Sequence, residues 1–336
     1  MIKKLKIPKF KRKEKKIRII LTIVFIITLI ITTSHLVKEI NRKEDINLNL
    51  ALANDSRLEF YRSQFPLRNW DVPTPIIGAS GFLVASIEPE GKPKILFDKN
   101  RTQRLPIASI AKLMTAVIVL EEYNLNEVIA ITEEAFLKDH MRTNVLYPGE
   151  TYKVKDLLYA SLIESSNTAA HALAQRATAP YYQPISANLF VNRMNQKAVT
   201  LGMNNTRFIN PSGLDPANPR DVAGYSTPDD LLILAEYLLK KPKIWEILSI
   251  KEFNLKTNEG SFKYIMSNTN GLLDEPGIIG GKTGQTARAR GCLFMVSKNP
   301  KSEGYLISII LGSQDRFGET RTLLRTAKEA FHWIKI

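Results

Sequence analysis

The chain has 336 residues with ordinary aromatic, glycine and proline contents, so it can bury a large core in one or two domains, and bulk disorder is excluded. Its formal net charge of +14 is concentrated at one end. Residues 1–18 hold ten Lys or Arg and one acid, a net +9, which leaves +5 for the other 318 residues. The charge therefore indicates a basic tail, and no nucleic-acid partner is expected.

An apolar stretch follows the tail. Residues 19–37 are apolar apart from scattered Thr, Ser and one His, and roughly 20 apolar residues span a bilayer. The preceding basic block predicts a cytoplasmic N-terminus that contacts membrane lipids, with everything after Lys38 outside the cytoplasmic membrane. The alternative, a cleaved signal peptide, normally has an apolar core of only about 7–15 residues. We expect an uncleaved single-pass transmembrane anchor.

The next segment, residues 38–75, has mixed charge and ends in two prolines, which predicts an extracytoplasmic stalk before a folded domain at 76–336. Two strands joined by a turn are predicted at Gly81–Ile87 and Lys94–Phe97. Helical spacing of apolar residues then predicts a helix from Ser109 to about Glu121.

The middle of the domain, roughly residues 115–245, is predicted to be helical, with a long loop at Asn210–Tyr225 that could be a solvent-facing connector. Later elements are expected as strands Ile278–Gly281, Cys292–Ser297 and Tyr305–Leu311 and as a closing amphipathic helix Phe317–Trp333. Strands at both ends around a helical middle favour an α+β fold, in which a sheet domain carries an inserted all-helical subdomain.

The chain has one cysteine, Cys292, so no internal disulfide can form. Its apolar neighbours predict a small buried strand residue rather than a nucleophile. The four histidines show no spacing typical of a metal site, and neither a metal nor a cofactor is expected.

A candidate nucleophile is Ser109. Lys112 lies three residues later, so the two side chains share one face of the predicted helix. A buried lysine with a lowered pKa can accept a serine proton, and a helix N-terminus favours the oxyanion that then forms. For an isolated Ser-x-x-Lys, an N-cap serine beside a solvated lysine is the commoner interpretation.

Two further motifs follow in order. Ser165-Ser166-Asn167 lies at a predicted turn between helices, and Lys282-Thr283-Gly284 follows a predicted edge strand. Ser-x-x-Lys, Ser-x-Asn and Lys-Thr-Gly together are typical of class A β-lactamases and penicillin-binding proteins. Taken singly, Asn167 could be a helix cap and Thr283 an ordinary strand residue.

With these motifs the chain resembles the low-molecular-mass D-alanyl-D-alanine carboxypeptidases, which are serine penicillin-binding enzymes of cell-wall metabolism. The likeness extends from about Gly81 to Phe331. It includes residues 148–152 and 156–160 before Ser165, residues 190–195, 201–203 and 210–214 in the middle, and residues 268–270 before Lys282. The resemblance implies a β-lactamase/transpeptidase-like fold, with an antiparallel sheet flanked by helices.

The resemblance also implies roles for individual residues. Ser109 attacks the carbonyl between the last two D-alanines of a peptidoglycan stem peptide, forming an acyl-enzyme that β-lactams can trap. Lys112, neutral because it is buried beside Lys282, is the general base. Ser165 passes a proton to the departing amine, and Asn167 orients the substrate amide and Lys112.

Substrate binding is expected on the Lys-Thr-Gly segment. The backbone N–H groups of Ser109 and Gln285 would form the oxyanion hole beside Gly284. Lys282 and Thr283 would receive the terminal carboxylate, together with Arg316, which could otherwise be a solvated residue before a helix.

The chain departs from the family pattern at several places. Thr168 stands where an aspartate is usual, and residues 287–291 are unusually basic. Many relatives carry a β-domain and an amphipathic anchor after the catalytic domain, whereas this sequence ends after its last predicted helix, so the N-terminal segment is expected to be the anchor.

Other functions remain open. A DD-endopeptidase that cuts peptidoglycan crosslinks would use the same motifs. A β-lactamase is disfavoured because no class A type glutamate loop lies between Gly202 and Tyr225. A non-catalytic penicillin-binding sensor is disfavoured because all catalytic residues are present and the tail is too short for an output module.

Overall fold

The computed structural model describes residues 21, 23–40, 66–89, 91–138, 146–176 and 186–333. The chain divides into two units, residues 1–65 and 66–336. The expected basic tail and most of the expected stalk lie outside the described residues. The second unit begins at Pro66, ten residues earlier than the sequence suggests, because strand β1 (Leu67–Arg68) pairs with strand β13 (Phe331–His332).

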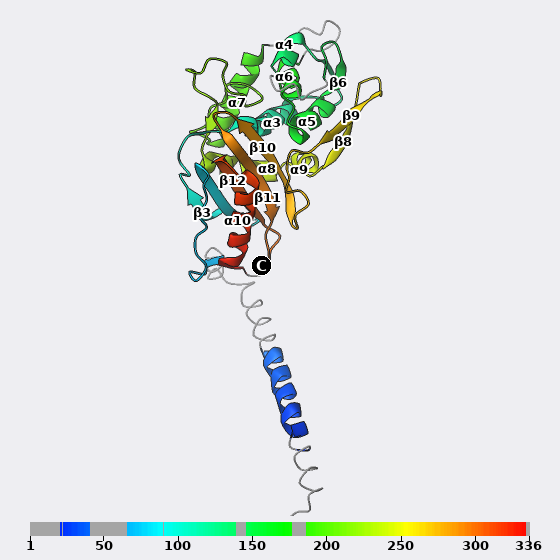
Figure 1. The fold of residues 1–336 in the computed structure, drawn as a ribbon. Coiled ribbons are helices and arrows are strands. Elements are labelled where there is room, and N and C mark those ends of the chain that lie inside the picture. Colours follow the sequence, from blue (N-terminus) through cyan, green and yellow to red (C-terminus); the bar gives the residue numbers. More distant parts are fainter. Residues whose placement is uncertain are drawn as a thin grey trace, which may run out of the picture. The chain divides into compact units, whose positions relative to one another are not determined.

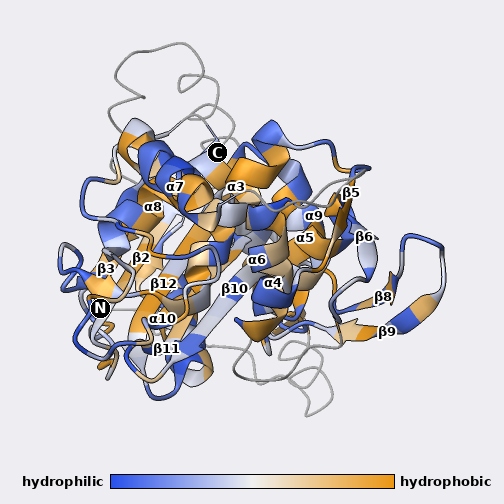
Figure 2. Cartoon of the chain, turned by 90° about the horizontal axis from the view of Figure 1, so that it is seen from above, coloured by the Kyte–Doolittle hydropathy of each residue, from blue (hydrophilic) through white to orange (hydrophobic). Residues whose placement is uncertain are grey.

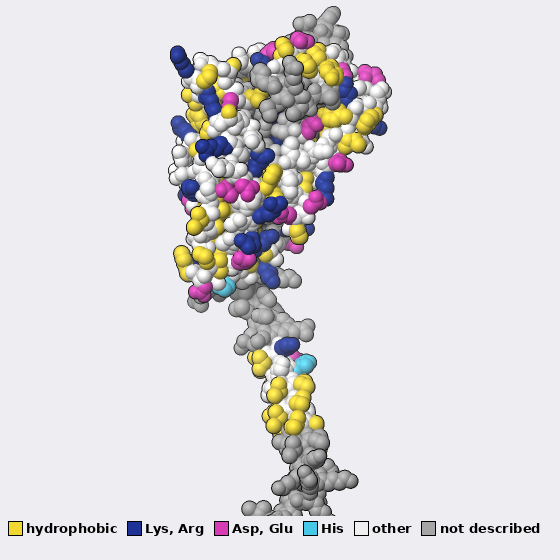
Figure 3. Space-filling model, viewed as in Figure 1, with side chains coloured by type: hydrophobic (Ala, Val, Ile, Leu, Met, Phe, Trp, Pro, Cys, Tyr) yellow, Lys and Arg dark blue, Asp and Glu magenta, His cyan; other side chains and the backbone are white. Residues whose placement is uncertain are grey.

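The first unit contains the helix Ile23–Ile40, which is long and apolar enough to cross a membrane. At about 1.5 Å per residue it is roughly 27 Å long, close to the thickness of a bilayer core. Its apolar side chains cover the face seen in Figure 3. The hydroxyls of Thr28 and Thr33 donate to the carbonyls of Val24 and Leu29, so the polar groups of these threonines are satisfied within the helix.

The second unit is built on a five-stranded antiparallel sheet (Figure 1). Its strand order is β10 (Ile278–Thr286), β11 (Arg290–Lys298), β12 (Tyr305–Ser313), β2 (Gly81–Ile87) and β3 (Lys94–Lys99). The strands predicted from sequence are therefore confirmed, although four of them, β3, β10, β11 and β12, extend further than expected. The Lys-Thr-Gly segment lies inside edge strand β10 rather than after it, because the strand continues to Thr286.

Both faces of the sheet are buried, and alternate side chains of a strand enter different cores. In β2, Phe82 and Val84 face helix α10 (Arg316–Glu329), whereas Leu83 and Ala85 face the helical part of the unit. There helix α8 (Pro228–Leu239) packs on β2 and β12, and helix α9 (Pro242–Leu248) packs on β10. The sheet is thus a central layer between helices.

The helical part confirms the expected α+β architecture. Its helices are α3 (Lys112–Glu122), α4 (Glu133–Leu137), α5 (Val154–Ile163), α6 (Asn167–Gln175) and α7 (Ala187–Leu201), together with α8 and α9. The same stretch contains the short strands β5 (Val128–Ala130), β6 (Thr151–Lys153) and β7 (Tyr225–Ser226), so it is mainly rather than wholly helical. Strand β7 pairs with β4 (Leu105–Pro106) just before the Ser109 segment.

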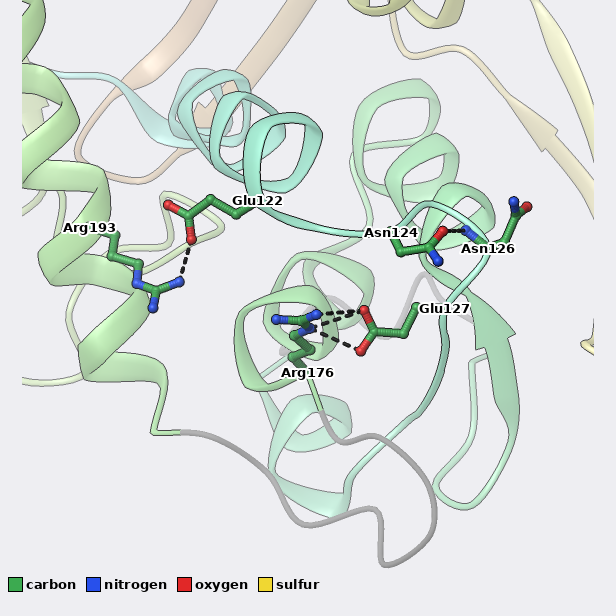
Figure 4. A network of polar contacts seen from close by, with 6 residues as sticks. All are labelled: Glu122, Asn124, Asn126, Glu127, Arg176 and Arg193. Carbon is green, nitrogen blue, oxygen red and sulfur yellow. Dashed lines mark hydrogen bonds and ion pairs between the residues drawn. The ribbon is translucent and has the colours of Figure 1, made fainter.

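Ion pairs connect neighbouring segments of the helical part (Figure 4). Arg176, which ends α6, donates through Nε and Nη2 to both carboxylate oxygens of Glu127 at 2.8–3.1 Å. Arg193 of α7 pairs with Glu122 at the end of α3. Because the Arg176 pair is bidentate, it holds α6 to the segment after α3 in a defined orientation.

Two differences from the sequence prediction concern the C-terminal half. A hairpin of β8 (Glu252–Lys256) and β9 (Phe262–Ser267) projects from the body and was not expected (Figures 1 and 2). The closing helix ends at Glu329, not at Trp333, because the chain then extends into β13.

Candidate active site

Ser109 lies in a short 3₁₀ helix, η1 (Ala108–Ala111), that leads directly into α3. The sequence predicts an α-helix from Ser109, whereas the α-helix begins at Lys112. In a 3₁₀ turn, residues three apart are eclipsed, so Ser109 and Lys112 come closer than in an α-helix. Ala108, just before the serine, has φ 47°, a left-handed conformation that is unusual for alanine. The turn carrying Ser109 is therefore held in place by its surroundings.

Lys112 is completely buried, and its amine is surrounded by oxygen atoms. Nζ lies 2.8 Å from Ser109 Oγ, 2.7 Å from Asn167 Oδ1 and 3.0 Å from the carbonyl oxygen of Ser212. The last two oxygens can only accept hydrogen bonds. A neutral amine would give its two N–H groups to them and keep its lone pair for the Ser109 hydroxyl. The arrangement is therefore suited to removing the Ser109 proton.

The Ser-x-Asn motif occupies the turn between α5 and α6. Ser165 has φ 67°, and Ser166 is the N-cap of α6, its hydroxyl accepting from the N–H of Ala169 at 3.0 Å. Because Ser166 caps the helix, the side chain of Asn167 is directed to Lys112 instead. The alternative interpretation of Asn167 as a helix cap is thus wrong.

Lys282 is the second fully buried lysine of the site. Its Nζ donates to the carbonyl of Thr283 at 3.0 Å. Burial, and then repulsion by the charge of Arg316, lowers the pKa of Lys282 to about 7. This side chain can therefore gain or lose its charge near neutral pH.

Thr283 and Gly284 bring β10 close to the end of α5, just before Ser165, and to η1. The Thr283 hydroxyl is 2.6 Å from the hydroxyl of Thr269, whose backbone N–H donates to the carbonyl of Ile163 at the end of α5. A Cβ on Gly284 would lie 3.1 Å from the backbone nitrogen of Ser109. Only a residue without a side chain lets β10 approach the serine this closely.

Arg316 comes from the start of α10, yet it contacts β10. Its Nη1 donates to Gln285 Oε1 at 2.7 Å and to the carbonyl of Gly284 at 3.4 Å. Burial lowers the pKa of this guanidinium from its usual value. Arg316 also lines a cavity of about 600 Å³ with Gln285, Thr286, Arg290, Gly291, Ser313, Gln314, Asp315 and Phe317. The arginine is therefore only partly solvated and lies beside the Lys-Thr-Gly strand.

Residues 210–214, which belong both to the family resemblance and to the loop that could be a connector, form a turn that contributes to the site. Asn210 Oδ1 accepts from the backbone N–H groups of Ser212, Gly213 and Leu214 at 2.6–3.2 Å. Gly213 has φ +79°, and a Cβ there would lie 1.9 Å from the carbonyl oxygen of Ala108. The turn thus packs against η1 and supplies the Ser212 carbonyl to Lys112.

Cys292 is buried in β11, as predicted, and burial raises the pKa of its thiol to about 11. Arg288 donates from Nη1 and Nη2 to the carbonyls of Asp221 and Pro219, so this cation of the basic turn binds the chain's own loop. Among the described residues, no group of three His, Cys, Asp or Glu side chains could hold a metal ion.

A family model described as D-alanyl-D-alanine carboxypeptidase, of the Peptidase_S11 family, matches residues 85–315. A D-alanyl-D-alanine carboxypeptidase of Bacillus subtilis is 33% identical over 226 residues, which cover 66% of this chain and 54% of that protein. A D-alanyl-D-alanine endopeptidase of Pseudomonas aeruginosa is 33% identical over 254 residues, covering 74% of this chain and 76% of that protein. The chain thus spans about half the length of the first relative.

Among solved structures, penicillin-binding protein D2 of Listeria monocytogenes in an ampicillin-bound form has a similar fold. The TM-score is 0.61 at 28% sequence identity, and the match covers 76% of this chain and 99% of that one. The described fold, an antiparallel sheet between helices, is therefore that of a penicillin-binding protein.

Proposed function

The chain belongs to the D-alanyl-D-alanine carboxypeptidase family of serine peptidases, and on this premise we propose that it removes the terminal D-alanine from peptidoglycan stem peptides. The observation that carries the proposal is the position of Lys112 Nζ, 2.8 Å from Ser109 Oγ and within hydrogen-bond distance of two oxygens that can only accept. This geometry supports Ser109 as nucleophile and Lys112 as general base.

In the acylation step, Ser109 Oγ attacks the carbonyl carbon of the penultimate D-alanine while its proton passes to Lys112 Nζ. The negative charge that develops on the carbonyl oxygen is received by the backbone N–H groups of Ser109 and Gln285. Gly284 is the residue of β10 at which this strand approaches η1, and it directly precedes Gln285. Removing one such donor typically costs about 3–4 kcal/mol of transition-state stabilisation.

Collapse of the tetrahedral intermediate breaks the peptide bond. The nitrogen of the departing D-alanine takes a proton through Ser165, which is two residues from the Asn167 contact with Lys112. The acyl-enzyme ester on Ser109 is then hydrolysed by water, and the Lys112 amine again accepts the proton. Asn167 orients both Lys112 and the substrate amide.

The terminal carboxylate of the substrate would be bound by Lys282, Thr283 and Arg316. Both cations lie on or beside β10, and the charge of Arg316 acts on Lys282. A carboxylate between them would relieve this repulsion and keep Lys282 protonated. Recognition of a free carboxylate makes the enzyme act at chain ends, which supports carboxypeptidase activity.

A DD-endopeptidase is the second candidate, because the P. aeruginosa relative bears that name at the same identity as the carboxypeptidase of B. subtilis. An endopeptidase cuts crosslinks that need not present a free carboxylate next to the cleaved bond. Incubation with purified crosslinked muropeptides, followed by mass spectrometry, distinguishes loss of one D-alanine from separation of the two stem peptides.

We also propose the location and the inhibitors of the enzyme. The helix Ile23–Ile40 would anchor the chain in the cytoplasmic membrane, with the N-terminus inside and the peptidase unit outside. Since the Listeria penicillin-binding protein binds ampicillin, β-lactams are expected to acylate Ser109 of this chain.

The decisive experiment measures D-alanine release from a peptide ending in Lys-D-Ala-D-Ala by the full chain in detergent. The wild-type protein should release D-alanine and form a covalent adduct with a fluorescent penicillin, and Ser109→Ala should do neither. Unchanged release by Ser109→Ala would disprove the proposed site. The variant Ser302→Ala, which changes a serine remote in sequence from the three motifs, serves as a control and should remain active.

A further inference from the structure

His171 is a buried residue to which the proposed mechanism gives no role. It lies on α6, one turn after Asn167, and is 4% exposed. Its Nε2 is 3.2 Å from the hydroxyl of Ser212, whereas its Nδ1 has no hydrogen-bond partner within the described part of the chain. A buried imidazole with one unsatisfied nitrogen is costly, so a structural filler here would more readily be an apolar side chain.

The contact joins the two elements that hold Lys112. Helix α6 supplies Asn167 Oδ1, and the turn 210–214 supplies the Ser212 carbonyl oxygen. The His171–Ser212 hydrogen bond connects the same helix to the same residue of the turn. The His171–Ser212 bond therefore sets the distance between Asn167 Oδ1 and the Ser212 carbonyl oxygen. When Lys112 is neutral, its two N–H groups point to these oxygens, so their positions determine where its lone pair points.

The ring acts without a charge. Burial, followed by the charges of Lys112 on α3 and Lys138 after α4, lowers the pKa of His171 to about 3. The Ser212 hydroxyl contacts the ring and lies 3.1 Å from Asn210 Oδ1. The charged residues that line a cavity together with His171 are Lys138, Arg207, Asp215, Arg220 and Asp221. At neutral pH the histidine thus contributes a hydrogen bond and adds no repulsion to Lys112.

We propose that His171 is a positioning residue for the general base, which through Ser212 holds the two acceptors of Lys112 at the spacing that directs its lone pair to Ser109. This inference rests on the proposed function of Lys112. Without the bond, the turn can move from α6, water can reach the amine, and the amine becomes easier to protonate. The neutral form of Lys112, which accepts the Ser109 proton, is then less populated at neutral pH.

The test compares His171→Leu, which removes the bond, with His171→Gln, whose amide can still reach Ser212. The second-order rate of acylation by a fluorescent penicillin is measured from pH 5 to 9 with the full chain in detergent. For His171→Leu we expect a loss of about 10- to 100-fold at pH 7, the size of a small misplacement of a catalytic group. Its rising pH limb should move to higher pH, and His171→Gln should recover most of both effects.

Ser212→Ala provides an independent variant, since it removes the hydroxyl and keeps the carbonyl that accepts from Lys112. We expect the same alkaline displacement, and we expect the double variant with His171→Leu to be no worse than the worse single variant. Thr168→Val is the matched control, because Thr168 is also buried on α6 and its hydroxyl has no partner among the described residues. Its pH profile should be that of the wild type.

An unchanged pH limb in both His171→Leu and Ser212→Ala would overturn the inference, and so would fully additive losses in the double variant. If His171→Leu does not fold, Ser212→Ala and His171→Gln decide alone. Failure of the proposed function itself is recognised separately. In that case the wild-type protein would not be acylated by penicillin, or it would be acylated at the same rate as Ser109→Ala.

Discussion

At the scale of single residues, the site depends on two buried lysines in different surroundings. Lys112 lies among oxygen atoms of Ser109, Asn167 and Ser212, whereas Lys282 lies near a second cation, Arg316. The oxygen acceptors around Lys112 orient its amine, whereas the charge of Arg316 lowers the pKa of Lys282. The first arrangement suits a base, and the second suits a receptor for an anion.

Replacing Lys112 by Met should abolish the function of the base while filling much of the same volume. We expect the rate of acylation by penicillin to fall by about 10³-fold or more, since general bases contribute about 10²–10⁴-fold and act as a unit with the nucleophile. The control is Lys256→Met, which makes the same change at an exposed position. Acylation of Lys112→Met at the wild-type rate would refute the role of the lysine.

The pKa of Lys282, lowered to about 7, predicts a pH dependence of substrate binding. The free enzyme loses this positive charge as the pH rises through about 7, so kcat/KM for a peptide with a free C-terminal carboxylate should decline above that pH. The ratio of kcat/KM for this peptide to that for the same peptide amidated at its C-terminus isolates the effect. A ratio that stays constant from pH 6 to 9 would contradict a carboxylate-binding Lys282.

Lys282 should also influence stability. Its pKa is lower in the folded chain than the ordinary value of 10.5, so the unfolded chain binds more protons between about pH 7 and 10.5. The contribution of Lys282 to folding is therefore least favourable below pH 7 and improves as the pH rises. Lys282→Met is expected to raise the melting temperature more at pH 6 than at pH 9, as measured by calorimetry. A rise that is greater at pH 9 would show that the lysine is not buried with a lowered pKa.

At the scale of elements, the site depends on the close approach of β10 to η1. A Cβ at Gly284 would lie 3.0 Å from the carbonyl oxygen of Ile107 and 3.1 Å from Ser109 N, so either the strand or the turn must move. We expect Gly284→Ala to reduce acylation about 100-fold through misplacement of the oxyanion donors. Gly271→Ala is the control, because a Cβ there meets only ordinary contacts at 3.7 Å or more. Equal rates for these two variants would show that the approach is not needed.

A second contact between elements holds the 210–225 loop to the turn after β10. Asp215 accepts from the Thr286 hydroxyl at 2.9 Å and from the backbone N–H of Arg288 at 3.1 Å. Asp215→Asn should weaken this contact and increase amide hydrogen exchange in residues 210–225, with a loss of acylation of a few fold. Asp221→Asn removes the same charge from the same loop but leaves the Asp215 contacts in place. Similar exchange in both variants would mean that Asp215 does not hold the loop.

At the scale of the whole molecule, the first unit is expected to determine where the enzyme acts. A charged residue near the centre of a membrane helix costs about 2.5–3.5 kcal/mol. Ile27→Arg combined with Ile31→Arg should therefore move the chain from the membrane fraction to the soluble fraction, while D-alanine release from a soluble peptide persists. The same change at Ile76, which is 99% exposed in the second unit, should leave membrane attachment intact. Retention of the doubly substituted chain in washed membranes would contradict the anchor.

Much of the fold could be predicted from sequence because local patterns are sufficient for it. Short, mostly apolar runs bounded by turn residues marked the sheet strands, such as Gly81–Ile87, and helical spacing marked the helices around them. The same kind of signal was present in Glu252–Lys256, where polar and apolar residues alternate before a glycine-containing turn, so the β8–β9 hairpin could have been found. The three motifs identified the candidate nucleophile, base and anion-binding strand by residue type and order.

Local sequence patterns do not determine contacts between distant segments, and the Asn167–Lys112 contact and the place of Arg316 were expected only from the family resemblance. The tertiary structure decided that Ser109 lies in a 3₁₀ turn, that Ser212 gives its carbonyl to Lys112, and that Arg316 reaches β10. The reason is physical: each of these depends on packing between elements up to about 100 residues apart in the chain. Backbone carbonyls moreover carry no residue identity, so no motif can mark them.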